Sequence, residues 1–160
     1  MKVLTTAFVS LCFGASSLFG AAYDVDGAHT NVAFKVKHLM ISTVNGEFKK
    51  FDGKFEIDDT TKKLKSMTGE IDVASINTNI DKRDEHLRSA DIFDAKKFPK
   101  ITFVLDKIEG DKAYGKLTMK GITKEVVFNY EFGGTIEAPS GLIHAGFVLS
   151  GEINRIDYDI

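Results

Sequence analysis

Cysteine is nearly absent from this chain of 160 residues, which contains only Cys12. It lies in an uncharged, mostly apolar run, Val3 to Tyr23, that follows the basic residue Lys2 and includes the small residues Gly20-Ala21-Ala22. This order is typical of a secretory signal peptide, so we expect residues 1–22 to be removed by cleavage before Tyr23. The remaining chain then has no cysteine, which excludes a disulfide framework and a thiolate metal site.

A retained membrane anchor is the alternative interpretation of this N-terminus, because the uncharged run is just long enough to span a bilayer. The run contains five Ser and Thr residues, and no basic cluster follows it. Both features favour a cleaved leader, and with it a periplasmic location.

The chain also lacks an excess of charge of either sign, with 21 Lys and Arg against 23 Asp and Glu. No basic stripe points to nucleic acid as a partner. No block of like charge indicates a disordered tail. Residues 23–160 are enough to form one domain with a sizeable core.

Motifs for catalysis and metal binding are missing as well. The four histidines, His29, His38, His86 and His144, form no pair at the short spacing that a metal site needs. Gly110 to Lys116 match the start of a phosphate-binding loop, but Leu117 stands where Ser or Thr must bind magnesium. The sequence therefore predicts no catalytic residue, no metal and no cofactor.

The chain does contain a repeated alternation of apolar and polar residues with period two, which predicts strands. Turn signals separate the runs at 58–61, 110–111, 120–121 and 133–141. The phase slips near Lys50-Phe51, and we interpret this as a bulge at Asp52-Gly53 rather than a tight hairpin. About seven strands result, as in a barrel or sandwich, at 32–37, 44–57, 67–73, 101–106, 113–120, 126–132 and 145–153.

One segment departs from this pattern. Asp81 to Ala90 has helix formers and a candidate cap at Asn79 or Asp81, and Pro99 stops any helix before the next strand. Four glycines fall on the apolar phase of strands, where they mark either barrel bends, the more frequent reason, or room for a ligand: Gly46, Gly69, Gly115 and Gly151.

Three stretches of the chain together resemble the YceI-like family of periplasmic polyisoprenoid-binding proteins. They are Tyr23-Asp24-Val25-Asp26 with Ala28-His29-Thr30 and residues 34–38; Arg83-Asp84-Glu85-His86-Leu87-Arg88-Ser89-Ala90-Asp91 with Phe93, Phe98-Pro99 and residues 101–103; and residues 115–124, GKLTMKGITK.

The resemblance implies an all-β, lipocalin-like antiparallel barrel with one short helix beside it. It also implies an apolar tunnel that holds an isoprenoid or another long-chain lipid, with no chemistry performed. Family members continue with a further strand after the motif that matches residues 151–155, whereas this chain stops at Ile160. We therefore expect a barrel that lacks its last strand and exposes two edges.

The apolar phase of the strands supplies the expected tunnel lining: Val32, Phe34, Val36, Phe48, Ile71, Val73, Ile101, Phe103, Leu105, Leu117, Met119, Phe128, Tyr130, Phe147 and Leu149. The charged cluster of the helix either forms a polar rim that contacts a lipid head group, through Arg83, His86 and Arg88, or is a solvated helix face with local ion pairs. A homodimer and a transient contact with the membrane surface are left open. So is a second function, a periplasmic stress-response or interaction module without a lipid cargo.

Cleavage of the leader has a direct test. We expect protein recovered from the periplasm to begin at Tyr23, and its intact mass to lack residues 1–22. An intact mass that still includes these residues would contradict the signal-peptide assignment.

Overall fold

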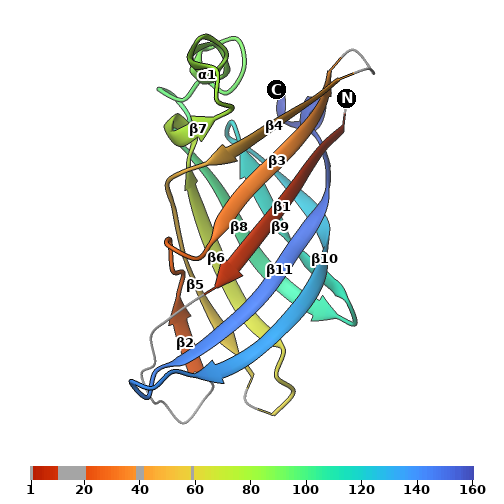
Figure 1. The fold of residues 1–160 in the computed structure, drawn as a ribbon. Helices are drawn as coiled ribbons and strands as arrows, with labels where there is room; N and C mark the ends of the chain where they lie inside the picture. Colours follow the sequence, from red (N-terminus) through yellow and green to blue (C-terminus); the bar gives the residue numbers. More distant parts are fainter. Residues whose placement is uncertain (1, 11–20, 39–41, 59) are drawn as a thin grey trace.

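The structure is a computed structural model that describes residues 2–10, 21–38, 42–58 and 60–160 (Figure 1). It consists of an 11-stranded sheet, one α-helix and two short 3-10 helices. Along the chain these elements are β1 Lys2–Ser10, β2 Ala21–Asp24, β3 Asn31–His38, β4 Ser42–Phe48, β5 Phe51–Ile57, β6 Leu64–Asp72, η1 Val73–Ser75, β7 Ile76–Asn77, α1 Asp81–Arg88, β8 Lys100–Glu109, β9 Lys112–Met119, β10 Ile122–Glu137, β11 Ile143–Asn154 and η2 Arg155–Tyr158.

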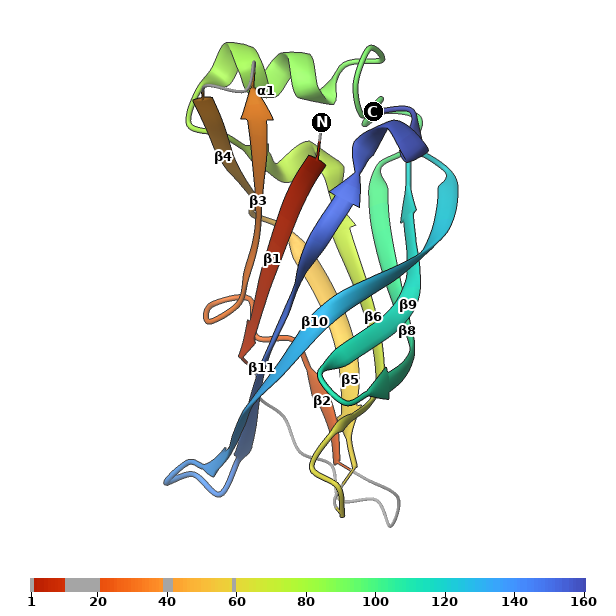
Figure 2. The ribbon, with the colours of Figure 1, turned by 90° about the vertical axis from the view of Figure 1, so that its right-hand side faces the viewer.

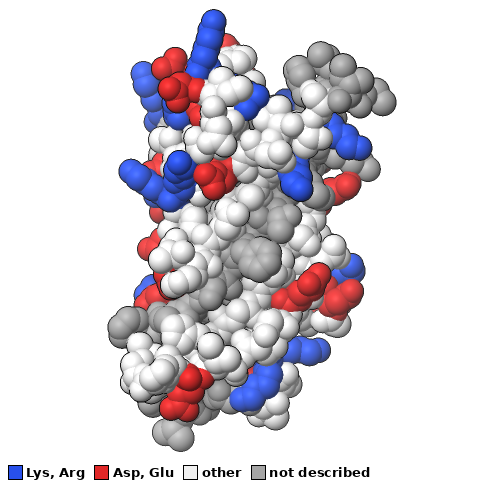
Figure 3. Space-filling view, in the orientation of Figure 1, with Lys and Arg blue, Asp and Glu red and all other residues white. Residues whose placement is uncertain are grey.

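Every strand pair in the sheet is antiparallel, in the order β2-β5-β6-β8-β9-β10-β11-β1-β3-β4-β7. The sheet curls into a tall, twisted barrel, and α1 and η2 lie at the same end of it (Figures 1 and 2). This confirms the all-β, lipocalin-like fold and the single short helix that the sequence predicts. Basic and acidic side chains are interspersed on the outer face that Figure 3 shows.

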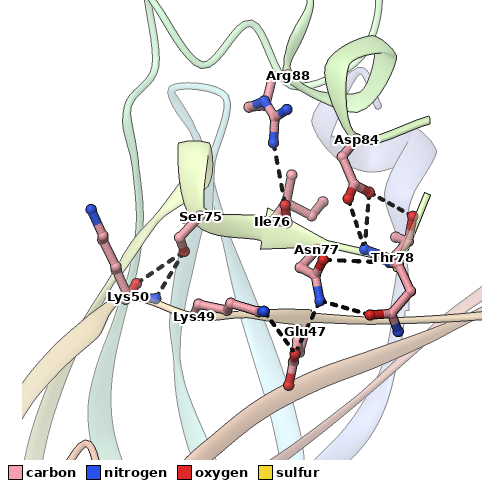
Figure 4. Close-up of polar contacts among 10 residues, drawn as sticks. Glu47, Lys49, Lys50, Ser75, Ile76, Asn77, Thr78, Asp84 and Arg88 are labelled. Atoms are coloured by element: carbon pink, nitrogen blue, oxygen red, sulfur yellow. Dashed lines mark hydrogen bonds and ion pairs between the residues drawn. The ribbon is translucent and has the colours of Figure 1, made fainter. Parts of the chain in front are cut away.

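The β5–β6 pair and the β4–β7 pair, which lie near opposite ends of the strand order, meet where β4 leads into β5 and β6 leads into β7. Lys49 N donates to Ser75 O at 3.2 Å, and Asp72 N donates to Lys50 O at 2.9 Å. The Ser75 hydroxyl accepts from Lys50 N at 3.0 Å (Figure 4). These bonds continue the β5–β6 ladder into the β4–β7 ladder, so the sheet closes on itself beneath α1.

This junction corrects the bulge predicted at Asp52-Gly53. Both residues pair in regular register with Glu70 and Gly69, so neither a bulge nor a hairpin forms there. The phase slips instead at Lys49–Lys50, where the chain passes from β4 to β5 and faces the η1 turn. Two residues outside a ladder shift the alternation just as a bulge does, so the sequence alone does not separate the two cases.

The predicted loop at 133–141 is also shorter than expected. β10 continues through Gly133 and Gly134 to Glu137, and the register against β11 shifts between Phe132 and Gly134. The two glycines therefore accommodate a bulge inside a long hairpin. The turn itself is closed by Ala138 N donating to Leu142 O at 2.7 Å.

Helix α1 begins at Asp81, as predicted, but neither proposed cap is used. Its N-cap is Ile80, which makes no side-chain hydrogen bond, and Asn79 takes a positive φ of 62°. The helix start is held instead by Asp84, whose carboxylate accepts from Thr78 N at 2.9 Å. Thr78 precedes Asp84 by six residues, a spacing that differs from the usual N-cap pattern.

Three of the four apolar-phase glycines lie under aromatic rings. A Cβ on Gly115 would come within 2.6 Å of the Phe103 ring, and one on Gly151 within 2.6 Å of the Phe128 ring. Gly46 lies in the same way beneath Phe34. Gly69 differs, because a Cβ there would meet only Met67 Cε, at 3.8 Å. Three of the glycines thus make room for rings of the protein itself, and one faces open space.

Strand β1 lies between β11 and β3, and it is formed by residues of the predicted leader (Figure 1). It pairs with β11 from Lys2–Asn154 to Ser10–Gly146. In this structure the place beside β11, where the sequence predicts a missing strand, is therefore filled from the N-terminus. A chain that begins at Tyr23 loses β1 and also loses Ala21 and Ala22 of β2.

The role of β1 is tested by comparing residues 1–160 with residues 23–160. Without β1 the facing backbone groups of β3 and β11 lose their partners. If the free energy of unfolding falls by about 2 kcal/mol, the melting temperature should fall by about 5 °C. Amides on the facing edges of β3 and β11 should also exchange faster with deuterium.

Adding a peptide with the sequence of residues 2–10 should slow that exchange again. The matched control is the same peptide with proline at Thr5 and Ala7, because proline removes the backbone donor that the ladder needs. Equal rates of amide exchange in residues 1–160 and residues 23–160 would mean that the barrel closes without β1.

The inside and outside faces of β8 give a second test. Phe103 is 8% exposed and packs against Phe128 at 5.5 Å between ring centroids, whereas Thr102 lies on the opposite, half-exposed face. Phe103→Ala should lower the free energy of unfolding by about 3 kcal/mol. Thr102→Ala should change it by less than about 0.5 kcal/mol. Urea unfolding followed by circular dichroism measures both, and a larger loss at Thr102 would reverse the assignment of faces.

Candidate functional site

Two apolar cavities lie inside the barrel and share part of their walls. The inner cavity has a volume of about 120 Å³, and the outer cavity, beside α1, has a volume of about 320 Å³. Both are lined by the same four side chains: Phe48, Ile101, Met119 and Ile153. One apolar surface therefore continues from the barrel interior to the end of the barrel that carries α1.

The inner cavity is walled mostly by inward-facing apolar side chains from most strands of the barrel. The alternation of these residues with polar neighbours aims them inward. Gly69 lies in this wall and leaves it open. Apart from Phe48, Ile101, Met119 and Ile153, the lining is Val25, Thr30, Val32, Phe51, Asp52, Met67, Gly69, Glu70, Ile71, Phe103, Leu117, Phe128 and Leu149.

The outer cavity is walled partly by the barrel and partly by α1 and the segment that follows it. Phe34, Val36 and Val44 contribute from β3 and β4. The ring of Phe93 packs edge-on against Phe48, with 6.3 Å between ring centroids, and so fixes the segment after α1 over the barrel. The remaining lining is Leu87, Ile92, Ile160 and the basic residues Arg83, His86 and Arg155.

A buried hydrogen-bond network sets the position of α1. Asp84 is 4% exposed and accepts from both the backbone and the hydroxyl of Thr78 (Figure 4). Arg83 donates from Nε to Thr78 Oγ1 at 2.7 Å and from Nη2 to Thr78 O at 2.8 Å. Arg88 donates to Ile76 O at 3.3 Å. The two arginines of the helix therefore bind β7 and Thr78, the residue that follows it.

The short helix η2 carries two buried polar atoms without hydrogen-bond partners in the described part of the chain, Arg155 Nε and the Tyr158 hydroxyl. Tyr158 is 2% exposed. Burial, together with the nearby Asp157 carboxylate, raises the pKa of Tyr158 to about 12, so the phenol stays neutral at ordinary pH. A buried polar atom without a partner costs about 1–3 kcal/mol.

Most of the site residues predicted from sequence line these two cavities. They are Val32, Phe34, Val36, Phe48, Ile71, Ile101, Phe103, Leu117, Met119, Phe128, Leu149, Arg83 and His86. Whether they contact a ligand stays a prediction. The His86 side chain is 63% exposed and lies 3.9 Å from Asp91 Oδ2.

The other predicted site residues lie outside both linings. Tyr130 accepts from Leu64 N at 3.1 Å, and Phe147 packs on Phe55 with 4.9 Å between ring centroids. Both belong to a filled part of the core, where aromatic rings occupy the space that a tunnel would need. Val73 is buried in η1, Leu105 faces a different hollow, and Arg88 is bonded to β7.

Sequence reasoning missed several lining residues. Met67 and Ile153 lie on the apolar phase of their strands, so the alternation itself could have found them. Leu87, Ile92 and Phe93 belong to or follow the helix, where no period-two pattern exists. Arg155 follows the last residue of β11 and has no periodic signal at all.

A larger hollow of about 540 Å³ lies on β2, β5, β6 and β8. Its lining includes Asp24, Lys54 and Glu56, and Lys54 Nζ lies 3.1 Å from Asp24 Oδ1. Charged walls of this kind do not suit an apolar chain. The apolar cavities are therefore the stronger candidate for a binding site.

No three His, Cys, Asp or Glu side chains of the described residues come together in a way that could hold a metal ion. None of the helices in the described part of the chain combines the length and the apolar character that crossing a bilayer requires.

Comparison with known proteins places this geometry in a family. A UPF0312 protein of Staphylococcus aureus strain MSSA476 is 42% identical over 139 residues, which cover 86% of this chain and 81% of the relative. The crystal structure of the Campylobacter jejuni YCEI protein matches with a TM-score of 0.72 and 37% identity, over 92% of this chain and 85% of that one.

The structure of Burkholderia cenocepacia BcnA shares the fold, with a TM-score of 0.54 and 21% identity over 92% of this chain and 96% of that one. The sequence model of the YceI-like domain matches residues 23–160, which include every strand of the barrel wall from β3 to β11. The chain therefore belongs to the YceI-like family.

Proposed function

We propose that this protein is a periplasmic binding or carrier protein that holds a long-chain isoprenoid or a similar amphiphilic lipid in the two connected cavities. The observation that carries this proposal is the continuous apolar surface through Phe48, Ile101, Met119 and Ile153. The YceI-like fold is a binding domain and not a known enzyme family, which agrees with a cargo-binding role.

The energetics of such a site favour a chain-like ligand. Burying one methylene group contributes about 0.8 kcal/mol, so a long chain gains affinity with few polar contacts. The outer cavity, at about 320 Å³, lies within the range of small-molecule sites. A lipid would enter from the α1 end, with its tail directed toward the inner cavity.

Filling the inner cavity from Gly69 tests this function without removing any contact. The backbone of Gly69 is ordinary strand, and a Cβ there meets only Met67 Cε. Gly69→Ile should therefore fold, because a β-branched side chain suits a strand. It should weaken the binding of farnesol about 10-fold, a loss of about 1.4 kcal/mol, as measured by isothermal titration calorimetry.

Gly146→Ile is the matched control. A Cβ on Gly146 meets nothing within 4 Å, and the residue lines neither cavity. This variant should bind farnesol like the wild type. Equal affinities of all three proteins would contradict the proposed site, and a wild type that binds no prenol or other long-chain lipid would favour an interaction module instead.

A further inference from the structure

Arg155 is placed differently from the other basic residues around the outer cavity. It begins η2, directly after β11, and lines the cavity together with Ile153 and Ile160. Its Nε is shielded from solvent and has no hydrogen-bond partner among the described residues. Nor does any ion pair formed between described residues include its guanidinium group.

Two acidic side chains of η2 and α1 are already engaged. Asp157 accepts from Asn154 Nδ2 at 3.0 Å, and Asp84 is bonded to Thr78. Arg83, by contrast, donates from Nε and Nη2 to Thr78. Of the two arginines on the wall of the outer cavity, Arg155 is therefore the one that donates no side-chain hydrogen bond to the described residues. A buried donor without an acceptor is unfavourable.

The two cavities also differ in the sign of their charged lining. The outer cavity is lined by three basic side chains, Arg83, His86 and Arg155, and by no acidic side chain. The inner cavity is lined by Asp52 and Glu70 and by no basic side chain. Lys100 Nζ lies 2.9 Å from Glu70 Oε1 and offsets its charge, so the contrast comes mainly from the three basic residues, which attract an anionic group to the α1 end of the apolar surface.

We propose that Arg155 binds the anionic head group, a carboxylate or a phosphate, of the lipid held in the cavities. The proposal rests on the lipid-binding function proposed above. The planar guanidinium group presents Nε–H and an Nη–H side by side, which matches two oxygens of either anion. The lipid chain then runs past Ile153, Met119 and Phe48 into the inner cavity.

Four probes separate the head group from the chain: farnesyl monophosphate, farnesol, dodecanoate and dodecanol. Their dissociation constants are measured by calorimetry for the wild type, Arg155→Gln, Arg155→Lys and Lys82→Gln. Lys82 is exposed on α1 and lines neither cavity, so its substitution removes the same charge from the same end of the barrel without touching the site.

We expect the wild type and Lys82→Gln to bind at least one of the two anions at least 10-fold more tightly than the matching alcohol. Arg155→Gln should lose this preference and still bind both alcohols like the wild type, and Arg155→Lys should keep part of it. If Arg155→Gln loses the preference only between farnesyl monophosphate and farnesol, the cargo class is a prenyl phosphate. If it loses the preference only between dodecanoate and dodecanol, the cargo class is a fatty acid.

An anion preference that persists in Arg155→Gln would overturn the role of Arg155. An equal loss of affinity for anions and alcohols in Arg155→Gln would overturn it too, because that result indicates a structural role. Thermal melting of each variant, with Arg155→Met included, shows whether such a loss comes from unfolding. A wild type that binds the alcohols but does not prefer the anions refutes the head-group proposal alone. Failure to bind any of the four probes refutes the lipid-binding function itself.

Discussion

The backbone hydrogen bonds that join β4 and β5 to β6 and β7 are the constraint on which the rest of the structure depends. They join the β5–β6 pair to the β4–β7 pair at Lys49, Lys50, Asp72 and Ser75, and the Ser75 hydroxyl adds a bond to Lys50 (Figure 4). Phe48 lies beside this junction and lines both cavities. Because β7 leads directly into α1, the same bonds hold the helix over the end of the barrel. Opening the junction would therefore disrupt the cavity wall and release its cover together.

Affinity and orientation come from different parts of the site. The apolar lining shared by the two cavities favours any chain of suitable girth, because burial of methylene groups has no direction. Direction comes from the charged side chains that line the outer cavity beside α1, which are all basic. The aromatic rings that cover Gly115 and Gly151 limit the width of the interior. A thin ligand fits such a space better than a broad one.

Much of the fold could be predicted from the alternation of apolar and polar residues. It gave the main strands, the inward face of Phe103 and the single helix, because each of these depends on local sequence. It misplaced the phase slip between β4 and β5, underestimated the length of the β10–β11 hairpin and did not find how the start of α1 is held. The first two depend on contacts between separate segments, Lys49–Lys50 facing η1 and Gly133 facing Gly146. The third depends on Asp84 accepting from Thr78 six residues earlier, a spacing that standard capping patterns do not use.

The sequence by itself determined which side chains of each strand face inward, and so most of the apolar lining, since period two fixes the face of a residue once its strand is known. Only the tertiary structure decided which inward residues surround empty space and which, like Tyr130 and Phe147, pack against other rings. Only the tertiary structure, too, brought Arg155 into the wall of the outer cavity. No local pattern marks a single cation at the end of a strand, because its surroundings come from segments as far away as β3 and α1.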